Sequence, residues 1–302
     1  AFDKKSRLWL ATEHGVYIFD GKAFFSADSI YPELSLLKNS FVTKVIFENN
    51  NIWLTTMGHG AVKYDTKSHQ LTHFTPKNNN APSLKYNAIV VYKGDILLSV
   101  RDYGLLKYDQ VTNSLVPYFT GYSNASEHVT GMLVKGDELW LGSIGKGIYR
   151  FHQGTLEQLT ISDGLISNLS FTLALDGKGR VWVASDAGIS IVNKDFSVER
   201  VLNQDQGLMG NAVWAIIFDG QESMWVGGSD GLVQININDF KVRNFTENDG
   251  IQGFEYNFGA AWLSPQGQVF IGGANGFNQF YPEKISEQLP IPPLFLTEIA
   301  IL

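Results

Sequence analysis

The sequence predicts an all-β protein, a seven-bladed β-propeller of four-stranded antiparallel blades whose first blade is incomplete at the N-terminus. One motif recurs seven times: an apolar-Trp-apolar triplet, a short polar stretch, and Gly before an alternating apolar strand. In two of the seven triplets, Leu97 and Phe270 replace the Trp. The central residues of the seven triplets stand 42 to 45 residues apart, at positions 9, 53, 97, 140, 182, 225 and 270. A four-stranded blade has two apolar faces, so blades of this period must stack around a common axis.

Each repeat supplies four strands in the same order. In the second repeat, residues 42–47, 52–55, 61–64 and 70–74 alternate as strands one to four. Tight turns join the first two strands, built from residue types that tolerate positive φ. The Gly-containing turns lie at 93–95, 135–137, 176–179, 219–220 and 266–267. We expect the motif tryptophans to pack between neighbouring blades; they are Trp9, Trp53, Trp140, Trp182 and Trp225.

The first repeat begins late. Its opening residues, 1–3, align with 174–176, which end the first strand of the fifth repeat. Most of the innermost strand of the first blade is therefore expected to precede this chain or to come from other sequence. We interpret the chain as a processed or excised part of a longer protein.

Composition excludes several classes of function. The 302 residues are 44% hydrophobic, which argues against disorder. The net charge is −7 and the charged residues are scattered along the chain, which argues against binding to nucleic acid or to anionic membranes. The chain has no cysteine, so disulfides, thiolate chemistry and Cys-ligated zinc are excluded. The longest apolar runs fall far short of the roughly 20 residues that cross a bilayer.

A second motif precedes the later repeats. The segment Asp163-Gly164-Leu165-Ile166-Ser167-Asn168 leads into repeat five, and similar segments at 206–211 and 249–253 lead into repeats six and seven. Together with the Trp triplet, this pattern resembles the two-component regulator propeller repeat. Residues 272–283 resemble the closing repeat of that family, and 292–299 resemble the first strand of the immunoglobulin-like triple-tyrosine domain that follows it. Repeats one to three depart from the pattern, because Asp-Gly-Leu is missing before them.

The resemblance implies a domain division and a cellular role. Residues 1–289 would form the propeller, and 290–302 a linker and the first strand of a following domain. In that family, propellers form the periplasmic sensor of a membrane receptor whose output is a histidine kinase or a diguanylate cyclase. The implied ligand is an oligosaccharide or another small polar molecule. Other implied partners are the immunoglobulin-like domain, a second propeller of the same receptor and a second copy in a homodimer, but no nucleic acid.

The loops between the second and third strands are the predicted ligand-binding positions. In a propeller whose first strand is innermost, these loops share a face with the connections between blades. They differ between repeats although the flanking strands do not, and packing does not dictate such variation. The mixed charges suit a neutral or weakly charged polyhydroxylated ligand better than a polyanion. The predicted ligand-binding residues are Glu13, His14, His59, Arg101, Tyr103, Lys146, Asp186, Asp230 and Asn275.

Aromatic residues in the blade connections are a second group of candidates. An aromatic face beside Asn, Asp or Arg offers a sugar ring an apolar platform with planar hydrogen-bond partners. The three longer or more polar connections, 26–40, 75–85 and 118–128, contribute Tyr31, Tyr86 and Tyr122. The entries to repeats six and seven contribute Trp214 and Glu255-Tyr256-Asn257. By contrast, Asn39, Asn168 and Asn211 are expected to bond the connections to backbone groups.

No catalytic or metal motif is recognisable in the sequence. His14 and His59 share the predicted face, where two imidazoles near Glu13 or Asp102 could support acid-base chemistry or a metal. Their separation of 45 residues matches no ligand spacing, and phosphate loops and nucleophile elbows are missing. We therefore predict no catalytic residue, no metal, no cofactor and no enzymatic activity in this fragment.

Two alternatives stay open. One is a propeller lyase acting on a lactone or polysaccharide, because the streptogramin lyases are seven-bladed, with similar Trp-Gly repeats and a histidine base. The other is a purely structural or dimerising propeller.

Overall fold

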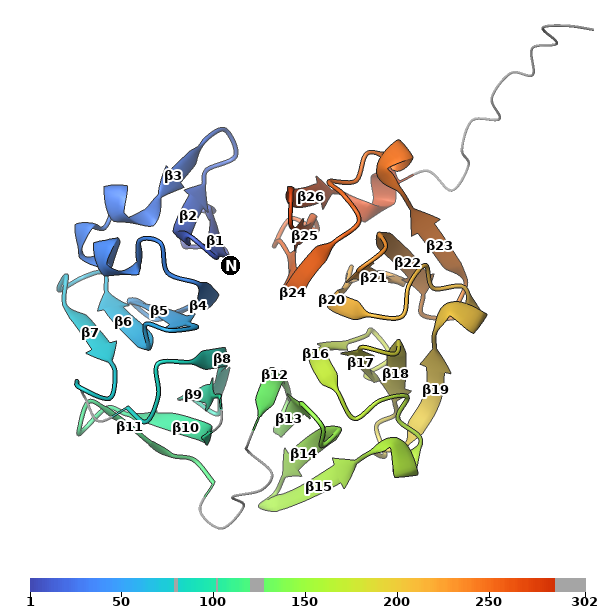
Figure 1. The fold of residues 1–302 in the computed structure, drawn as a ribbon, viewed down its shortest axis with the longest axis horizontal. Coiled ribbons are helices and arrows are strands. Elements are labelled where there is room, and N and C mark those ends of the chain that lie inside the picture. Colours follow the sequence, from blue (N-terminus) through green and yellow to red (C-terminus); the bar gives the residue numbers. More distant parts are fainter. Residues whose placement is uncertain (79–80, 102, 120–127, 286–302) are drawn as a thin grey trace, which may run out of the picture.

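Seven antiparallel sheets stand radially around one axis in the computed structural model, which describes residues 1–285 except 79–80, 102 and 120–127 (Figure 1). Within these residues there is no α-helix, and the only helices are six short 3-10 turns. The predicted seven-bladed propeller is confirmed. The first strands of blades two to seven are innermost, as expected (Figure 1). The predicted linker and domain start at 290–302 lie outside the described residues.

Five blades have four strands each. Blade two contains β4 (Val42–Glu48), β5 (Asn51–Thr56), β6 (Ala61–Asp65) and β7 (Leu71–Phe74). Blade three contains β8 (Tyr86–Tyr92), β9 (Asp95–Val100), β10 (Gly104–Asp109) and β11 (Ser114–Pro117). Blade four contains β12 (Val129–Lys135), β13 (Glu138–Ser143), β14 (Ile148–His152) and β15 (Thr155–Leu159). Blade five contains β16 (Ser170–Leu175), β17 (Val181–Ser185), β18 (Ile189–Val192) and β19 (Val198–Leu202). Blade six contains β20 (Val213–Phe218), β21 (Ser223–Gly228), β22 (Leu232–Asn236) and β23 (Val242–Phe245).

The first and last blades have three strands each in the described part of the chain. Blade one contains β1 (Leu8–Thr12), β2 (Gly15–Phe19) and β3 (Phe24–Ser26), which are its second to fourth strands. Its first strand is represented only by a bridge between Phe2 and Leu8, so the predicted incompleteness is confirmed. Blade seven contains β24 (Tyr256–Leu263), β25 (Val269–Gly273) and β26 (Gly276–Phe280), one strand fewer than predicted.

Buried apolar side chains form six clusters between consecutive blades of the described chain. Trp9 of blade one packs with Ile52 and Leu54 of blade two. Trp182 of blade five packs likewise with Met224 of blade six. All five motif tryptophans are at most 1% exposed, which confirms their predicted place between blades.

A carboxylate ahead of the second strand holds the Trp ring and the preceding turn together. Trp182 Nε1 donates to Asp176 Oδ2 at 2.9 Å, and Arg180 Nε donates to the same oxygen at 2.7 Å. The other oxygen, Asp176 Oδ1, accepts the backbone N–H groups of Lys178 and Arg180 at 2.9 Å each. Asp3 with Trp9, and Asp219 with Trp225, repeat the carboxylate-indole contact. The buried polar groups are thereby paired, as a packed interior requires.

The glycine before the third strand lies against the backbone of the fourth. Gly60 has a φ of +82°, and a Cβ there would stand 2.2 Å from the carbonyl oxygen of Phe74. The corresponding distance is 2.1 Å for Gly147 and 2.2 Å for Gly188. Only a residue without Cβ allows this approach, which explains the Gly before the third strand in these three blades.

Aromatic contacts join the first and last blades. The rings of Phe2 and Phe270 are 5.5 Å apart, and Phe277 lies 6.0 Å from Phe19 and 6.1 Å from Phe24. In Figure 1 the ribbons of β1–β3 and β24–β26 stand apart, so side-chain contacts join these two blades. No helix in the described residues is long and apolar enough to cross a membrane.

Candidate functional site

The loops between the second and third strands share one face with the starts of the first strands. Ser170, which begins β16, pairs with Ser185, which ends β17, and Val213 of β20 pairs with Gly228 of β21. The loops therefore surround the mouth of the axis. All nine predicted ligand-binding residues lie in these loops or next to them, and all are exposed.

The structure spreads these residues around the rim. Among the described residues, no hydrogen bond or ion pair joins any two of the nine. Two of the nine accept hydrogen bonds through their carboxylates, and Asn275 donates its backbone N–H to a neighbouring connection. Asp186 Oδ1 accepts from Ser167 Oγ at 2.6 Å, Asp230 Oδ2 from Ser229 Oγ at 2.6 Å, and the backbone N–H of Asn275 donates to Gln252 Oε1 at 2.9 Å. Their binding of a ligand stays a prediction.

The two rim histidines form no pair. The backbone N–H of His14 donates to Thr12 Oγ1 at 3.1 Å, and the carbonyl oxygen of His59 lies 2.6 Å from His73 Nε2. Within the described chain, neither imidazole is bonded to the other or to a carboxylate, and no group of three His, Asp or Glu side chains could hold a metal. Asp102 is outside the described residues. In the part of the chain that the structure describes, no carboxylate is hydrogen-bonded to either imidazole.

Two of the five aromatic candidates, Tyr86 and Tyr256, are core residues, which corrects their proposed role as sugar platforms. Tyr86 is 0% exposed and Tyr256 is 3% exposed, and burial raises the pKa of Tyr256 to about 12. Tyr31 packs against the rings of Trp9 and Tyr64, each 5.6 Å away. Tyr86 and Tyr256 begin first strands at positions that point between blades, so their rings fill the core. Tyr122 lies outside the described residues.

The connections themselves are held by local hydrogen bonds. Segment 26–40 contains η1 (Ala27–Ser29) and η2 (Pro32–Leu37), which bury apolar side chains. In η3 (Ile161–Asp163), Asp163 Oδ2 accepts the backbone N–H of Thr160 at 2.9 Å, and Gly164 follows with a φ of +101°. Asn168 Oδ1 accepts the N–H of Ile161 at 2.8 Å, which confirms the structural role predicted for Asn168. The Asp-Gly-Leu motif is therefore a helix cap and turn.

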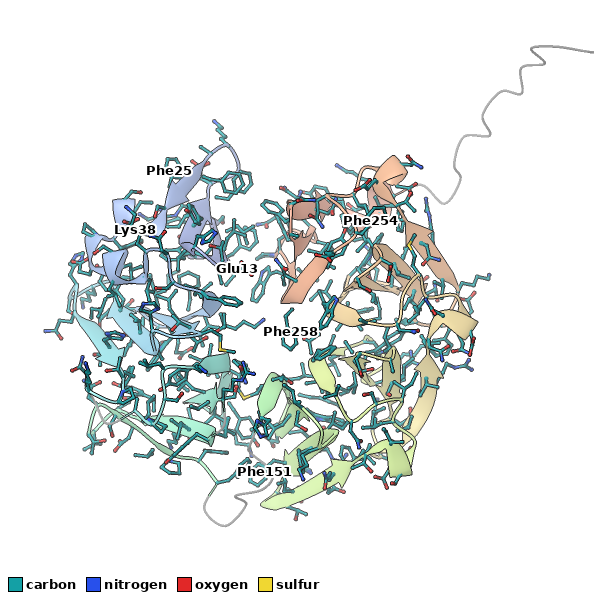
Figure 2. The ribbon with its side chains drawn as sticks, in the orientation of Figure 1. Glu13, Phe25, Lys38, Phe151, Phe254 and Phe258 are labelled. Carbon is teal, nitrogen blue, oxygen red and sulfur yellow. The ribbon has the colours of Figure 1, made fainter. Side chains whose placement is uncertain are left out.

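Trp214 belongs to a three-ring cluster at the axis, which we call the axial aromatic cluster: Phe171, Trp214 and Phe258. The rings of Phe171 and Trp214 are stacked, with centroids 4.6 Å apart and an interplanar angle of 24°. Phe258 lies 5.4 Å from Phe171 and 6.5 Å from Trp214. Phe258 is 44% exposed and occupies the centre of the ring in Figure 2. Only Trp214 of the three was a candidate from the sequence.

β-Bulges place these side chains at the axis. The pairing shifts by one residue around Phe171 in β16 and around Trp214 in β20. In β24 the pairing moves from Tyr256–Gly273 to Ala261–Ile271, so a longer bulge carries Phe258. Bulges bend a strand and redirect its side chains. One feature of the sequence indicated the longer bulge in blade seven. The central residues of the last two triplets, 225 and 270, are 45 residues apart, whereas those of the preceding pair, 182 and 225, are 43 apart.

The same bulge position is polar in blades two to four, where it carries Thr43, Asn87 and Thr130. Thr43 Oγ1 donates to the carbonyl oxygen of Tyr86 at 2.9 Å, and Asn87 Nδ2 donates to that of Val129 at 2.8 Å. Thr130 Oγ1 donates to a carbonyl oxygen of blade five. The mouth of the axis therefore has a polar half engaged in bonds between blades and an aromatic half.

A lysine crosses the axis beside the aromatic half. Lys44 Nζ, from blade two, donates to the carbonyl oxygen of Gly259, from blade seven, at 3.0 Å. Burial lowers the pKa of Lys44 below its ordinary value of 10.5. A Cβ placed on Gly259 would stand 3.1 Å from Lys44 Nζ and 4.0 Å from Thr172 Oγ1. The ammonium of Lys44 and the hydroxyl of Thr172 thus both lie near Gly259, the residue after Phe258.

Fold and site together define a β-propeller with one loop-lined face and an asymmetric axial mouth. No family model matches the chain, and no curated protein matches it. The chain is similar in structure to the extracellular domain of BT3049 from B. thetaiotaomicron, described as a hybrid two-component system, with a TM-score of 0.78 and 19% identity over 94% of this chain and 38% of that one.

PorZ of Porphyromonas gingivalis, a surface component of the type-IX secretion system, matches with a TM-score of 0.67 and 18% identity over 91% of this chain and 44% of its own. YCF48 in complex with the D1 peptide matches with a TM-score of 0.65 and 14% identity over 93% of this chain and 89% of its own. The chain therefore spans less than half the length of BT3049 or PorZ. At these identities the likeness concerns the fold.

Proposed function

We propose that this propeller is the extracytoplasmic, ligand-sensing part of a membrane signalling receptor of the two-component or cyclic-di-GMP type, without catalytic activity of its own. Its ligand is a glycan or another small polar molecule. The observation that carries the proposal is the set of seven unlike loops on one face of a repeated scaffold. The structural likeness to an extracellular domain of a two-component system supports it.

The rim is chemically suited to polyhydroxylated ligands. The side chains of Arg101 and Tyr103 are both exposed in the loop of blade three, and Lys146 is exposed in the next blade. A guanidinium and a phenol offer directional donors to hydroxyl groups, and the aromatic ring adds an apolar face. Carboxylates elsewhere on the rim disfavour a polyanion.

Binding of a glycan panel to this chain, followed by calorimetry with the best ligand, tests the proposal. We expect Arg101→Ala and Tyr103→Ala each to weaken binding by about 1 to 3 kcal/mol, which is a factor of about 5 to 150, while the melting temperature stays unchanged. Lys178→Ala is the control, because Lys178 is an exposed cation in the β16–β17 hairpin on the opposite face. Full affinity in both rim variants, or no binder in the panel, would contradict a sensing role for this face.

The alternatives make different predictions. A lyase would turn over a lactone or polysaccharide and would lose that activity in His59→Ala. A structural propeller would leave signalling unchanged in the rim variants of the receptor.

A further inference from the structure

The axial mouth combines a cluster of three aromatic rings with a lysine ammonium. The three rings of the axial aromatic cluster lie on consecutive blades, and the exposed side of Phe258 is covered by no neighbouring ring. Next to Phe258 in the chain, the carbonyl oxygen of Gly259 accepts a hydrogen bond from the ammonium of Lys44 at 3.0 Å. We therefore asked which ligand chemistry satisfies all of these groups together.

The aromatic side requires an apolar ring face. Elsewhere in this propeller, the motif tryptophans are buried, whereas Phe41 and Phe254 are about as exposed as Phe258. At the bulges of blades two to four, small polar side chains join adjacent blades without any exposed ring. The rings in blades five to seven are therefore more than an interblade contact, because Phe258 exposes 44% of its surface at the axis. Aromatic faces of this kind stack on flat or ring-shaped ligands.

The cation requires an anionic group. Lys44 Nζ donates to one carbonyl oxygen, and in the described residues no carboxylate forms an ion pair with it. An ammonium removed from water gains most from a charged acceptor at hydrogen-bond distance. A carboxylate above Gly259 could accept from Lys44 and from Thr172 at once.

We propose that the axial mouth binds a small monocarboxylate whose ring stacks on Phe171, Trp214 and Phe258 and whose carboxylate pairs with Lys44. Two sources share this chemistry, a uronate sugar and an aromatic acid. The axial site is separate from the rim residues of the proposed function. The proposal for the axial site can therefore be wrong while the proposed function is right, and the reverse.

Calorimetry with four probes tests the site: methyl β-D-glucuronide against methyl β-D-glucoside, and benzoate against benzyl alcohol. We expect one acid to bind at least tenfold more tightly than its neutral partner, and the binding pair identifies the source. Trp214→Ala and Lys44→Met should each lower the affinity of the protein for that acid at least tenfold. Lys44→Met should also bring the acid and its neutral partner to similar affinity, which a merely structural role would not do.

Matched controls separate this site from other surfaces. Trp262 is also 44% exposed but lies outside the cluster, so Trp262→Ala should change the affinity less than twofold. Lys178→Met should be equally silent, because Lys178 is an exposed cation in the β16–β17 hairpin on the opposite face. Circular dichroism and melting curves of Trp214→Ala and Lys44→Met establish that they fold. No binding by either acid, equal binding of the neutral partners to the unmodified chain, or full affinity in folded Trp214→Ala would overturn the proposal.

Discussion

Single carboxylates determine how the turns and tryptophans of this protein are held. Asp3 accepts hydrogen bonds from Trp9 Nε1 at 3.0 Å and from Arg7 Nε at 2.8 Å, and it also accepts two backbone N–H groups of its turn. Burial raises the pKa of Asp3, but these hydrogen bonds outweigh burial and leave the pKa below its ordinary value of 3.8. The charged form is therefore the one that stabilises the fold.

This shift predicts an acid-sensitive contribution to stability. A carboxyl whose pKa is lowered on folding stabilises the protein above its unfolded pKa and loses that effect as the pH falls through the folded value. We expect Asp3→Asn to lower the free energy of unfolding by about 1 to 3 kcal/mol at pH 7, and the difference from the unmodified chain to shrink below about pH 4. Urea unfolding of both proteins at pH 7 and pH 3 measures this difference in the free energy of unfolding. A difference that grew in acid would contradict the assignment, and the exposed Asp137→Asn is the control.

Blades two, four and five contain a close approach between their third and fourth strands. Gly60 and Gly94 have nearly the same φ, +82° and +83°, yet they differ in surroundings. A Cβ at Gly60 would collide with the backbone of Phe74, whereas a Cβ at Gly94 would meet nothing within 4 Å. Substituting alanine at each of the two positions therefore distinguishes the effect of backbone strain from the effect of a steric collision.

We expect Gly60→Ala to destabilise the protein clearly more than Gly94→Ala. Both substitutions strain the backbone by about 1 kcal/mol, but only the first forces β6 and β7 apart. Chemical denaturation of the two variants provides the comparison. Equal losses would mean that the collision is relieved by movement of β7.

The tryptophans between blades should contribute far more than exposed ones. Trp140 is 0% exposed and packs against the ring of Phe196 in the next blade, 5.1 Å away. Trp140→Ala should therefore lower the free energy of unfolding by about 3 to 5 kcal/mol. Trp262→Ala, which removes an exposed ring, is the matched comparison and should have a much smaller effect. A loss below about 1 kcal/mol for Trp140→Ala would contradict its packing role.

At the scale of the whole ring, the six interblade clusters contrast with the junction of blades one and seven. That junction is made by aromatic contacts among Phe2, Phe19, Phe24, Phe270 and Phe277. In blade one, β1 is paired along its length only with β2, whereas β17 in blade five is paired on both sides. Blade one should therefore open more readily than blade five.

Hydrogen exchange of this chain tests that difference. We expect amides of β1 that do not bond to β2 to exchange much faster than those of β17, because an edge strand leaves half of its backbone groups without a strand partner. Equal protection of β1 and β17 would show that another strand pairs with β1.

The sequence by itself determined the blade number, the strand order, the interblade tryptophans and the face that carries the unlike loops. These properties follow from a period of about 43 residues and from alternation within strands, both of which are local patterns. The sequence also predicted the incomplete first blade, because 1–3 align with the end of a strand. The sequence did not distinguish the buried Tyr86 and Tyr256 from Trp214 at the axis, since all three residues lie at the entry to a repeat.

Only the tertiary structure decided which residues meet at the axis. Phe171, Trp214 and Phe258 come from three different repeats, and Lys44 reaches Gly259 from 215 positions away. Their meeting depends on where the pairing slips by a residue in each first strand and on closure of the seven blades into a ring. A slip redirects a side chain without changing the alternation that a sequence displays, and ring closure joins segments with no local relation.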